Sequence, residues 1–123
     1  MKLSRLLLDA LETFPNFIII DKNATIVYLN ESYASILGIP REQAIGQPVT
    51  DVIPKTRMVE VLKSGKPDIG HLMTLYDHSQ KKNVTVACNR MPIFQNGQVI
   101  GAAAVTIMQD VLPTVTQLNR ELS

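Results

Sequence analysis

Residues Thr25 to Asp51 read TIVYLNESYASILGIPREQAIGQPVTD, and this segment is the most informative part of the chain about its fold. It begins as a short alternating strand that ends before Asn30, whose side-chain oxygen can accept hydrogen bonds from the free amides of a helix start. Gly38 then supplies a left-handed stop for the first short helix. A second short helix opens at Pro40 and closes at Gly46. So many small elements in so few residues predict a domain that encloses a cavity, as binding and sensing modules do.

An amphipathic helix and a β-hairpin surround the start of this stretch. Apolar residues at spacings of four, three and four predict a helix over residues 3–14, which Pro15 ends. Two strands, over residues 16–21 and 25–29, follow as a hairpin joined by a tight turn. The apolar stripe of the helix consists of Leu3, Leu7, Ala10 and Phe14.

The second half of the chain changes from helical to alternating periodicity. Thr56 can cap a third short helix, which Gly65 ends. Three long strands are predicted over residues 71–76, 83–91 and 99–108, joined as a meander by two polar turns. Pro92 has no amide to donate, so it marks a bulge or an edge near the end of its strand. A last helix is predicted from its apolar stripe, which again has spacings of four, three and four: Val111, Val115, Leu118 and Leu122.

Size and composition predict one globular domain. The chain has 123 residues, of which 46% are hydrophobic and 19% are charged, and its formal net charge is +1. A chain of this length can form the hydrophobic core of one domain, and its proportions of hydrophobic and charged residues are not those of a disordered chain. Because the charge is nearly balanced, no broad positive field is available for a phosphate backbone, and we expect no direct nucleic-acid contact.

Cysteine content and hydropathy predict a soluble cytoplasmic protein. Cys88 is the single cysteine, so no disulfide can form within the chain and a reducing compartment fits. The apolar runs are far too short to span a bilayer, and the N-terminus lacks the features of a signal peptide.

The element order and three sequence stretches carry a resemblance to a known family. The strand pair ending at Asn30, the run LGIPREQAIG over residues 37–46, and the closing Asn96-Gly97…Ile100-Gly101 hairpin together resemble a PAS domain over residues 5–110. The resemblance implies an α+β fold, in which a five-stranded antiparallel sheet carries short helices on one face and amphipathic helices at both ends. It also implies a ligand cavity between sheet and helices. The domain division is then an N-terminal dimerisation helix (1–14), a sensor core (15–110) and a C-terminal signalling helix (111–123).

A narrower resemblance lies in residues 52–65, which read VIPKTRMVEVLKSG, together with NRMPI at 89–93. These runs are similar to the PAS domains of sigma-54-dependent transcriptional activators. The resemblance implies a covalently attached ATPase and DNA-binding module, neither of which lies within these 123 residues. Ala24 departs from the family pattern, which often has glycine in this first turn.

Arg90 is the leading candidate for ligand binding. It continues the alternating run Val84, Val86 and Cys88, which the resemblance turns toward the cavity. A guanidinium group near an apolar wall needs an anionic or carbonyl partner, and a ligand carboxylate would supply one. Two alternatives stay open, in which Arg90 pairs with a protein carboxylate such as Glu31 or Asp51, or extends out to solvent.

Further cavity residues are expected around Arg90. Arg57 is a second candidate cation, although an exposed helical arginine is usually only solvated. Methionine side chains adapt to irregular cavities, and small residues on a strand leave space for a ligand or simply pack in the core. The additional ligand-binding candidates are Met58, Met73 and Ala103, with Leu75 as a further wall residue.

Cofactor and enzyme chemistry find little support in the sequence. His71 and Cys88 could form part of a redox or metal sensor, but a metal site wants three or four converging ligands. Residues 56–65 contain no histidine for haem, and residues 51–65 lack the cysteine motif of flavin-binding relatives. No nucleophile elbow, metalloprotease pair or phosphate-binding loop is present, so we expect no cofactor, no metal and no enzyme activity.

The sequence therefore leads to two functional hypotheses. In the first, a PAS sensor of a transcriptional regulator binds a small molecule, such as a carboxylate, and relays occupancy through its C-terminal helix. In the second, a ligand-free PAS module acts only in dimerisation and protein interaction. The terminal helices are marginal alone in water and need burial against another copy of the chain or against their own sheet.

Overall fold

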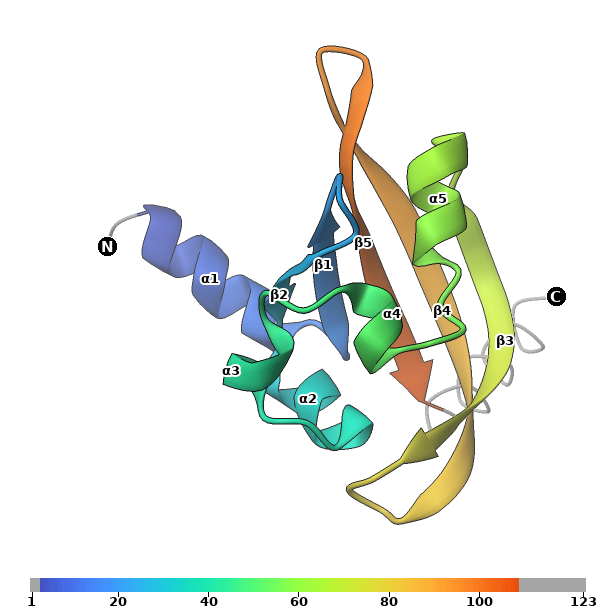
Figure 1. Ribbon diagram of the computed structural model, residues 1–123. Coiled ribbons are helices and arrows are strands. Elements are labelled where there is room, and N and C mark those ends of the chain that lie inside the picture. Colours follow the sequence, from blue (N-terminus) through green and yellow to red (C-terminus); the bar gives the residue numbers. More distant parts are fainter. Residues whose placement is uncertain (1–2, 109–123) are drawn as a thin grey trace, which may run out of the picture.

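The computed structural model describes residues 3–108 (Figure 1). One helix, two strands, a group of short helices and three strands follow one another as predicted, and the predicted C-terminal helix lies outside the described residues. The elements are α1 (Leu3–Thr13), β1 (Phe17–Asp21), β2 (Ile26–Leu29), α2 (Glu31–Leu37), α3 (Arg41–Ala44), α4 (Val49–Val52), α5 (Met58–Ser64), β3 (Asp68–Asp77), β4 (Lys82–Gln95) and β5 (Gln98–Met108).

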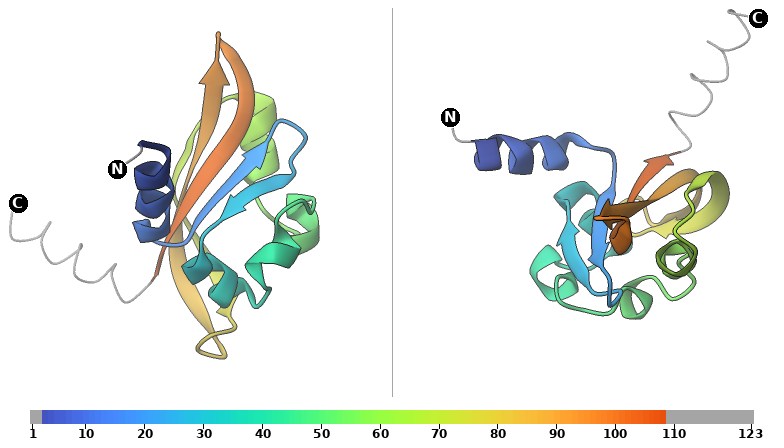
Figure 2. Two further views of the ribbon diagram at one scale, coloured as in Figure 1. Left: turned by 90° about the vertical axis from the view of Figure 1, so that its left-hand side faces the viewer. Right: turned by 90° about the horizontal axis from the view of Figure 1, so that it is seen from above.

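The five strands form one antiparallel sheet in the order β2-β1-β5-β4-β3. The short helices α2 to α5 cover one face of this sheet, and α1 projects away from the body (Figures 1 and 2). The predicted fold class is thereby confirmed. Among the described helices, none is both long and apolar enough to cross a bilayer.

Asn30 starts α2 as the sequence predicts, and it does more than cap a helix. Its Oδ1 atom accepts from the amides of Tyr33, at 3.2 Å, and Phe17, at 3.0 Å. Its Nδ2 atom donates to the carbonyls of Leu11, at 3.2 Å, and Phe14, at 2.8 Å. Because Asn30 is fully buried, this one side chain joins the end of α1, the start of β1 and the start of α2.

Two predicted boundaries change. The structure has four short helices instead of three, because Val49–Val52 forms one extra turn after Pro48. A single turn is too short to show helical periodicity in the sequence. The N-terminal helix ends at Thr13, so Phe14 lies just beyond it.

The three long strands extend beyond their predicted ends. Strand β3 starts at Asp68 instead of residue 71, and a register shift separates Asp68 from His71. Strand β4 continues through Pro92 to Gln95. The last pair between β3 and β4 is Asp68 with Arg90, so beyond Arg90 strand β4 has no neighbour on the β3 side. Pro92 lies in this edge part of β4, and a register shift against β5 follows between Ile93 and Phe94. The missing amide of Pro92 therefore leaves the ladder intact.

The turn between β1 and β2 is built around Ala24. Its φ angle is 62°, in the left-handed region where glycine is at ease. The carboxylate of Asp21 stabilises this turn, since its Oδ1 atom accepts from the amides of Asn23 at 2.9 Å and Thr25 at 3.1 Å. Alanine thus keeps the conformation that the family pattern usually assigns to glycine.

Candidate ligand-binding site

The inner face of β4 carries the predicted cavity residues. Val84, Val86, Cys88 and Arg90 are all buried, and the intervening residues face the other way or the solvent. Asn89 points away from the cavity, where its Oδ1 atom accepts from the amide of Gly70 at 2.7 Å. The alternation predicted for this strand is therefore present, and it places the guanidinium of Arg90 on the cavity side.

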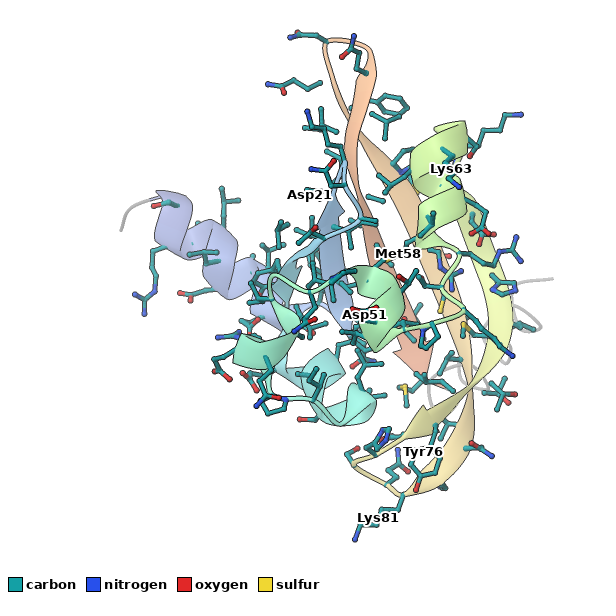
Figure 3. The ribbon with its side chains drawn as sticks, in the orientation of Figure 1. Asp21, Asp51, Met58, Lys63, Tyr76 and Lys81 are labelled. Atoms are coloured by element: carbon teal, nitrogen blue, oxygen red, sulfur yellow. The ribbon has the colours of Figure 1, made fainter. Side chains whose placement is uncertain are left out.

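Arg90 pairs within the domain, but with a different acid from the two considered. Its Nη1 atom lies 3.0 Å from Oδ2 of Asp68, and the two side chains are 5% and 20% exposed. Glu31 instead pairs with Arg41, at 3.3 Å, and Asp51 is exposed on α4 (Figure 3). The expected partners were wrong because β3 begins earlier than predicted, which sets Asp68 opposite Arg90 in the ladder.

Arg57 joins the same carboxylate from the start of α5. Its Nε atom lies 3.1 Å from the same Oδ2 atom of Asp68, and its side chain is 50% exposed. Two cations thus share a single anionic oxygen. We call Arg57, Asp68 and Arg90 the arginine–aspartate cluster; it carries a net charge of +1 from its three side chains.

Arg90 has two further neighbours on β3. Its Nη1 atom lies 3.4 Å from Nδ1 of His71, and its Nη2 atom lies 3.4 Å from the sulfur of Met73. An arginine donates and never accepts, so Nδ1 of His71 is the acceptor in this arrangement. These contacts orient the guanidinium plane, but they add no negative charge.

Cys88 lies deeper in the same wall. Its sulfur is 3.6 Å from the sulfur of Met73 and 3.4 Å from Oγ1 of Thr106. His71 is its partner across the ladder. Within residues 3–108, no group of three or more histidine, cysteine or acidic side chains converges as a metal site would require.

The cavity itself is small. It measures about 20 Å³, which accommodates roughly one water molecule. Met58, at the start of α5 (Figure 3), lines it from the helix side. In the described chain, no buried side-chain nitrogen or oxygen lacks a hydrogen-bond partner. The lining residues are Ile18, Tyr33, Ile53, Thr56, Met58, Met73, Leu75, Val86, Cys88, Arg90, Ala104 and Thr106.

One predicted cavity residue faces the wrong way. Ala103 lies on the opposite face of β5, because it alternates with Ala102 and Ala104, which are both buried in the core. Ala104 and Thr106 line the cavity instead. The sequence did not reveal this, because a register shift between Ile93 and Phe94 is what sets Ala104, and not Ala103, opposite Arg90.

Tyr33 brings a polar group into the cavity wall from α2. Burial raises the pKa of its phenol to about 12; hydrogen bonding with Thr106 lowers the pKa, Cys88 raises it, and the charge of Arg90 lowers it. Tyr33 therefore stays neutral and can donate a hydrogen bond over the physiological pH range.

The predicted dimerisation helix offers apolar side chains to its surroundings. Leu7 and Phe14 are 56% and 46% exposed, Ala10 is also exposed, and Leu6 and Leu8 add to the apolar surface. The side chain of Leu3 lies outside the described set. The predicted signalling residues Val111, Val115, Leu118 and Leu122 likewise lie outside the described residues.

The fold and the cavity wall define a class of sensory domain. A family model described as "PAS fold" matches residues 5–111, so the chain belongs to the PAS family. PAS domains are sensory modules that occur in larger signalling proteins, are generally non-catalytic and often dimerise.

One curated relative is a bacterial signalling protein. The chain is 36% identical over 87 residues to a probable C4-dicarboxylate sensor kinase of Halalkalibacterium halodurans. The match covers 70% of this chain but only 15% of the relative. The chain thus corresponds to a small part of that kinase.

Solved structures show the same fold. The PAS domain of BvgS from Bordetella pertussis has a TM-score of 0.66 at 16% identity, covering 96% of this chain and 97% of that domain. A Vibrio cholera VqmA–ligand–DNA complex has a TM-score of 0.70 at 15% identity, covering 100% of this chain and 59% of VqmA. A PAS domain from Colwellia psychrerythraea has a TM-score of 0.65 at 18% identity, covering 87% and 97%. At these identities the likeness concerns the fold alone.

Proposed function

We propose that this PAS domain is a cytoplasmic sensor of small carboxylates, which bind at Arg90 and relay their presence to an attached effector. The carrying observation is the buried guanidinium of Arg90, whose only anionic partner among the described residues is an oxygen that it shares with Arg57. A buried cation that cannot lose its proton favours an incoming anion. The name of the curated relative, a probable C4-dicarboxylate sensor kinase, supports this chemistry.

Binding requires the cavity to enlarge. The space beside Arg90 holds about 20 Å³, which is less than any organic acid needs. The thioethers of Met58 and Met73 line this space, and methionine side chains repack with little cost. A ligand would therefore select an expanded conformation of the domain, and that change of shape is the signal.

A thermal-shift panel of mono-, di- and tricarboxylates tests this proposal. We expect at least one acid to raise the melting temperature of the wild-type chain by several degrees at constant ionic strength. Arg90→Gln should abolish that shift relative to its own ligand-free melting temperature. Arg41→Gln is the matched control, since Arg41 lies in a different ion-pair group, and it should keep the full shift. The proposal fails if no acid stabilises the wild type.

A ligand-free interaction module is the second candidate, and the exposed face of α1 favours it. Leu6, Leu7 and Leu8 are each more than half exposed. A two-chain contact would remove this apolar surface from water. Light scattering should then find a dimer that Leu7→Glu converts to a monomer, while Arg5→Glu on the opposite side of the helix leaves it dimeric. A wild-type monomer would contradict this candidate.

The effector is also a matter of proposal. The run over residues 52–65 favours the ATPase of a sigma-54-dependent transcriptional activator, and the curated relative favours a sensor-kinase type of output. In both cases the signal would leave through the segment after β5, where the sequence predicts a helix. The sequence of the full-length protein that carries this domain decides between them.

A further inference from the structure

The arginine–aspartate cluster forms the wall between two spaces, a relation that the sequence did not predict. Arg90 lines the inner cavity of about 20 Å³. Arg57 and Asp68 line an outer groove of about 160 Å³, together with Glu60, Val61, Ser64, Lys66 and Pro67. Since Asp68 bridges the two arginines, its carboxylate stands between the groove and the cavity.

The segment that carries Asp68 is attached in a way that permits movement. Gly65 and Gly70 lie on either side of it, with φ angles of 67° and 69°. Glycine adopts this left-handed region, and others, without the steric cost that a side chain would add. A register shift interrupts the ladder between Asp68 and His71. Across this shift, the amide of Gly70 is held by a side chain, that of Asn89, instead of a neighbouring backbone.

Ile69 shows that the segment gains little from packing. Its side chain is 61% exposed, so the core does not hold this part of β3 in place. Side chains fix the segment against α5 and β4 through the two ion pairs of Asp68 and the hydrogen bond between Asn89 and Gly70.

Removing Asp68 from the cluster would leave two unpaired guanidinium groups side by side. Two like charges that share one small site repel each other unless anions replace the lost carboxylate. A dianion of small size restores neutrality best, because one carboxylate can engage Arg90 and the other can engage Arg57.

We propose that Asp68 occupies the position that a ligand carboxylate would take, and that a small dicarboxylate displaces it from Arg57 and Arg90. This inference rests on the proposed carboxylate sensing and adds the ligand class and the residue that sets the affinity. Displacement opens the wall, which joins the outer groove to the cavity and releases the start of β3. Asp68 thus lowers the affinity for every anion that binds here, and it rejects those that cannot replace both of its ion pairs.

Isothermal titration of the 123-residue chain with succinate, at fixed ionic strength, tests the inference. Asp68→Asn removes the competing charge while it keeps the shape, and we expect succinate to bind at least 10-fold more tightly than to the wild type. Glu60→Gln is the matched control, because it removes a carboxylate from the same groove without touching the cluster, and its affinity should change less than 3-fold. Arg90→Gln should lose binding, and acetate should bind the wild type at least 10-fold more weakly than succinate.

If Asp68→Asn folds poorly, amide hydrogen exchange of the wild type provides an independent test. In the wild type, saturation with succinate should speed the exchange of the Ile69 and Gly70 amides, since their segment is released, while the amides of β1 stay protected. The inference is overturned if an acid binds in an Arg90-dependent way but binds Asp68→Asn no more tightly than the wild type. It is also overturned if such an acid does not speed exchange at these amides. In both cases carboxylate sensing stays intact. Absence of binding by any acid in the thermal panel overturns both.

Discussion

Two ion-pair groups of the domain have opposite compositions, and only one of them contains a buried charge, that of Arg90. In the arginine–aspartate cluster, one carboxylate oxygen serves two arginines, and the Arg90 side chain is 5% exposed. Near the end of α1, one arginine serves two acids: Arg41 pairs with Glu12 at 3.1 Å and with Glu31 at 3.3 Å. All three side chains of this outer group are about one-third exposed or more.

The comparison indicates that burial, more than the number of ion pairs, decides how strongly a charged group attracts a counter-ion. Water screens the outer group, so its surplus negative charge needs no partner and its contribution to stability is small. Within the inner cluster, Arg57 is half exposed and is solvated, whereas Arg90 lies buried at the cavity wall, where water compensates its charge poorly. We therefore expect an incoming anion to be attracted to the inner cluster and not to the outer group.

Asn30→Ala should have the largest effect on stability. It tests whether burial also determines how much a neutral polar side chain contributes to the free energy of unfolding. Asn30 lies close to the outer group in the chain, yet it is fully buried and holds α1, β1 and α2 together. Loss of the cap, and of partners for buried backbone groups, should lower the free energy of unfolding by about 3 kcal/mol. Urea denaturation measures this change.

Asn30→Ser is the control for this variant. Its hydroxyl can still accept at the start of α2, as a good N-cap residue does, but it loses the donors to the carbonyls of Leu11 and Phe14, so its total cost should be smaller. Equal losses for the two variants would show that the cap contributes nothing.

Asp68→Ala should come next, with a loss of about 2 kcal/mol in the free energy of unfolding. Breaking a buried pair costs more, about 3–5 kcal/mol, but Asp68 is 20% exposed and Arg90 can turn toward water. Chemical denaturation in low salt gives the value. An effect below 0.5 kcal/mol would remove the distinction between the inner and outer groups.

The tyrosines extend the comparison to alkaline pH. The pKa of Tyr33 is about 12, raised chiefly by burial, whereas an unfolded tyrosine has a pKa near 10. The folded state thus resists ionisation, and the stability that the neutral phenol contributes is complete below pH 10 and disappears as the pH rises to about 12. Stability measured across this range should fall less in Tyr33→Phe than in the wild type.

Tyr28 is the surface counterpart. Its pKa is also about 12, because of partial burial first and then the hydrogen bond and charge of Glu12. Its surroundings are more open, so Tyr28→Phe should change the alkaline slope less than Tyr33→Phe. The reverse order would mean that the Glu12 contact matters more than burial.

Glu12→Ala should have the smallest effect, a loss below about 1 kcal/mol, as is usual for exposed ion pairs. Its contacts with Arg41 and with the hydroxyl of Tyr28 are both at the surface. Raising the salt concentration to 1 M should cancel most of this loss, since exposed pairs are screened over a few ångströms. The same salt should reduce the effect of Asp68→Ala much less.

Much of the fold could be predicted from local chemistry. The cap at Asn30, the stops at Gly38 and Gly65, and the alternation from Val84 to Arg90 each have a cause within a few residues, and the structure confirms them. The extra turn α4 was missed because four residues are too few for a helical period. The early start of β3 was missed because Gly70 and the register shift interrupt the alternation there.

The site was harder to predict because it depends on register across the sheet. Sequence reasoning found Arg90 and Arg57, but their shared partner Asp68 follows from a ladder position that no local pattern reveals. Ala103 was chosen in place of Ala104 by an error of one residue, which in a strand exchanges the two faces.

Asn16 and Thr106 connect the two ends of the domain core. Nδ2 of Asn16 donates to the carbonyl of Thr106 at 2.9 Å, and the amide of Thr106 donates to the carbonyl of Asn16 at 3.2 Å. These two hydrogen bonds join the residue directly before β1 to the C-terminal part of β5. The segment that leads from α1 into the sheet and the end of β5 are therefore held together directly. A rotation of one would be transmitted to the other through these two hydrogen bonds, without passing through the other strands.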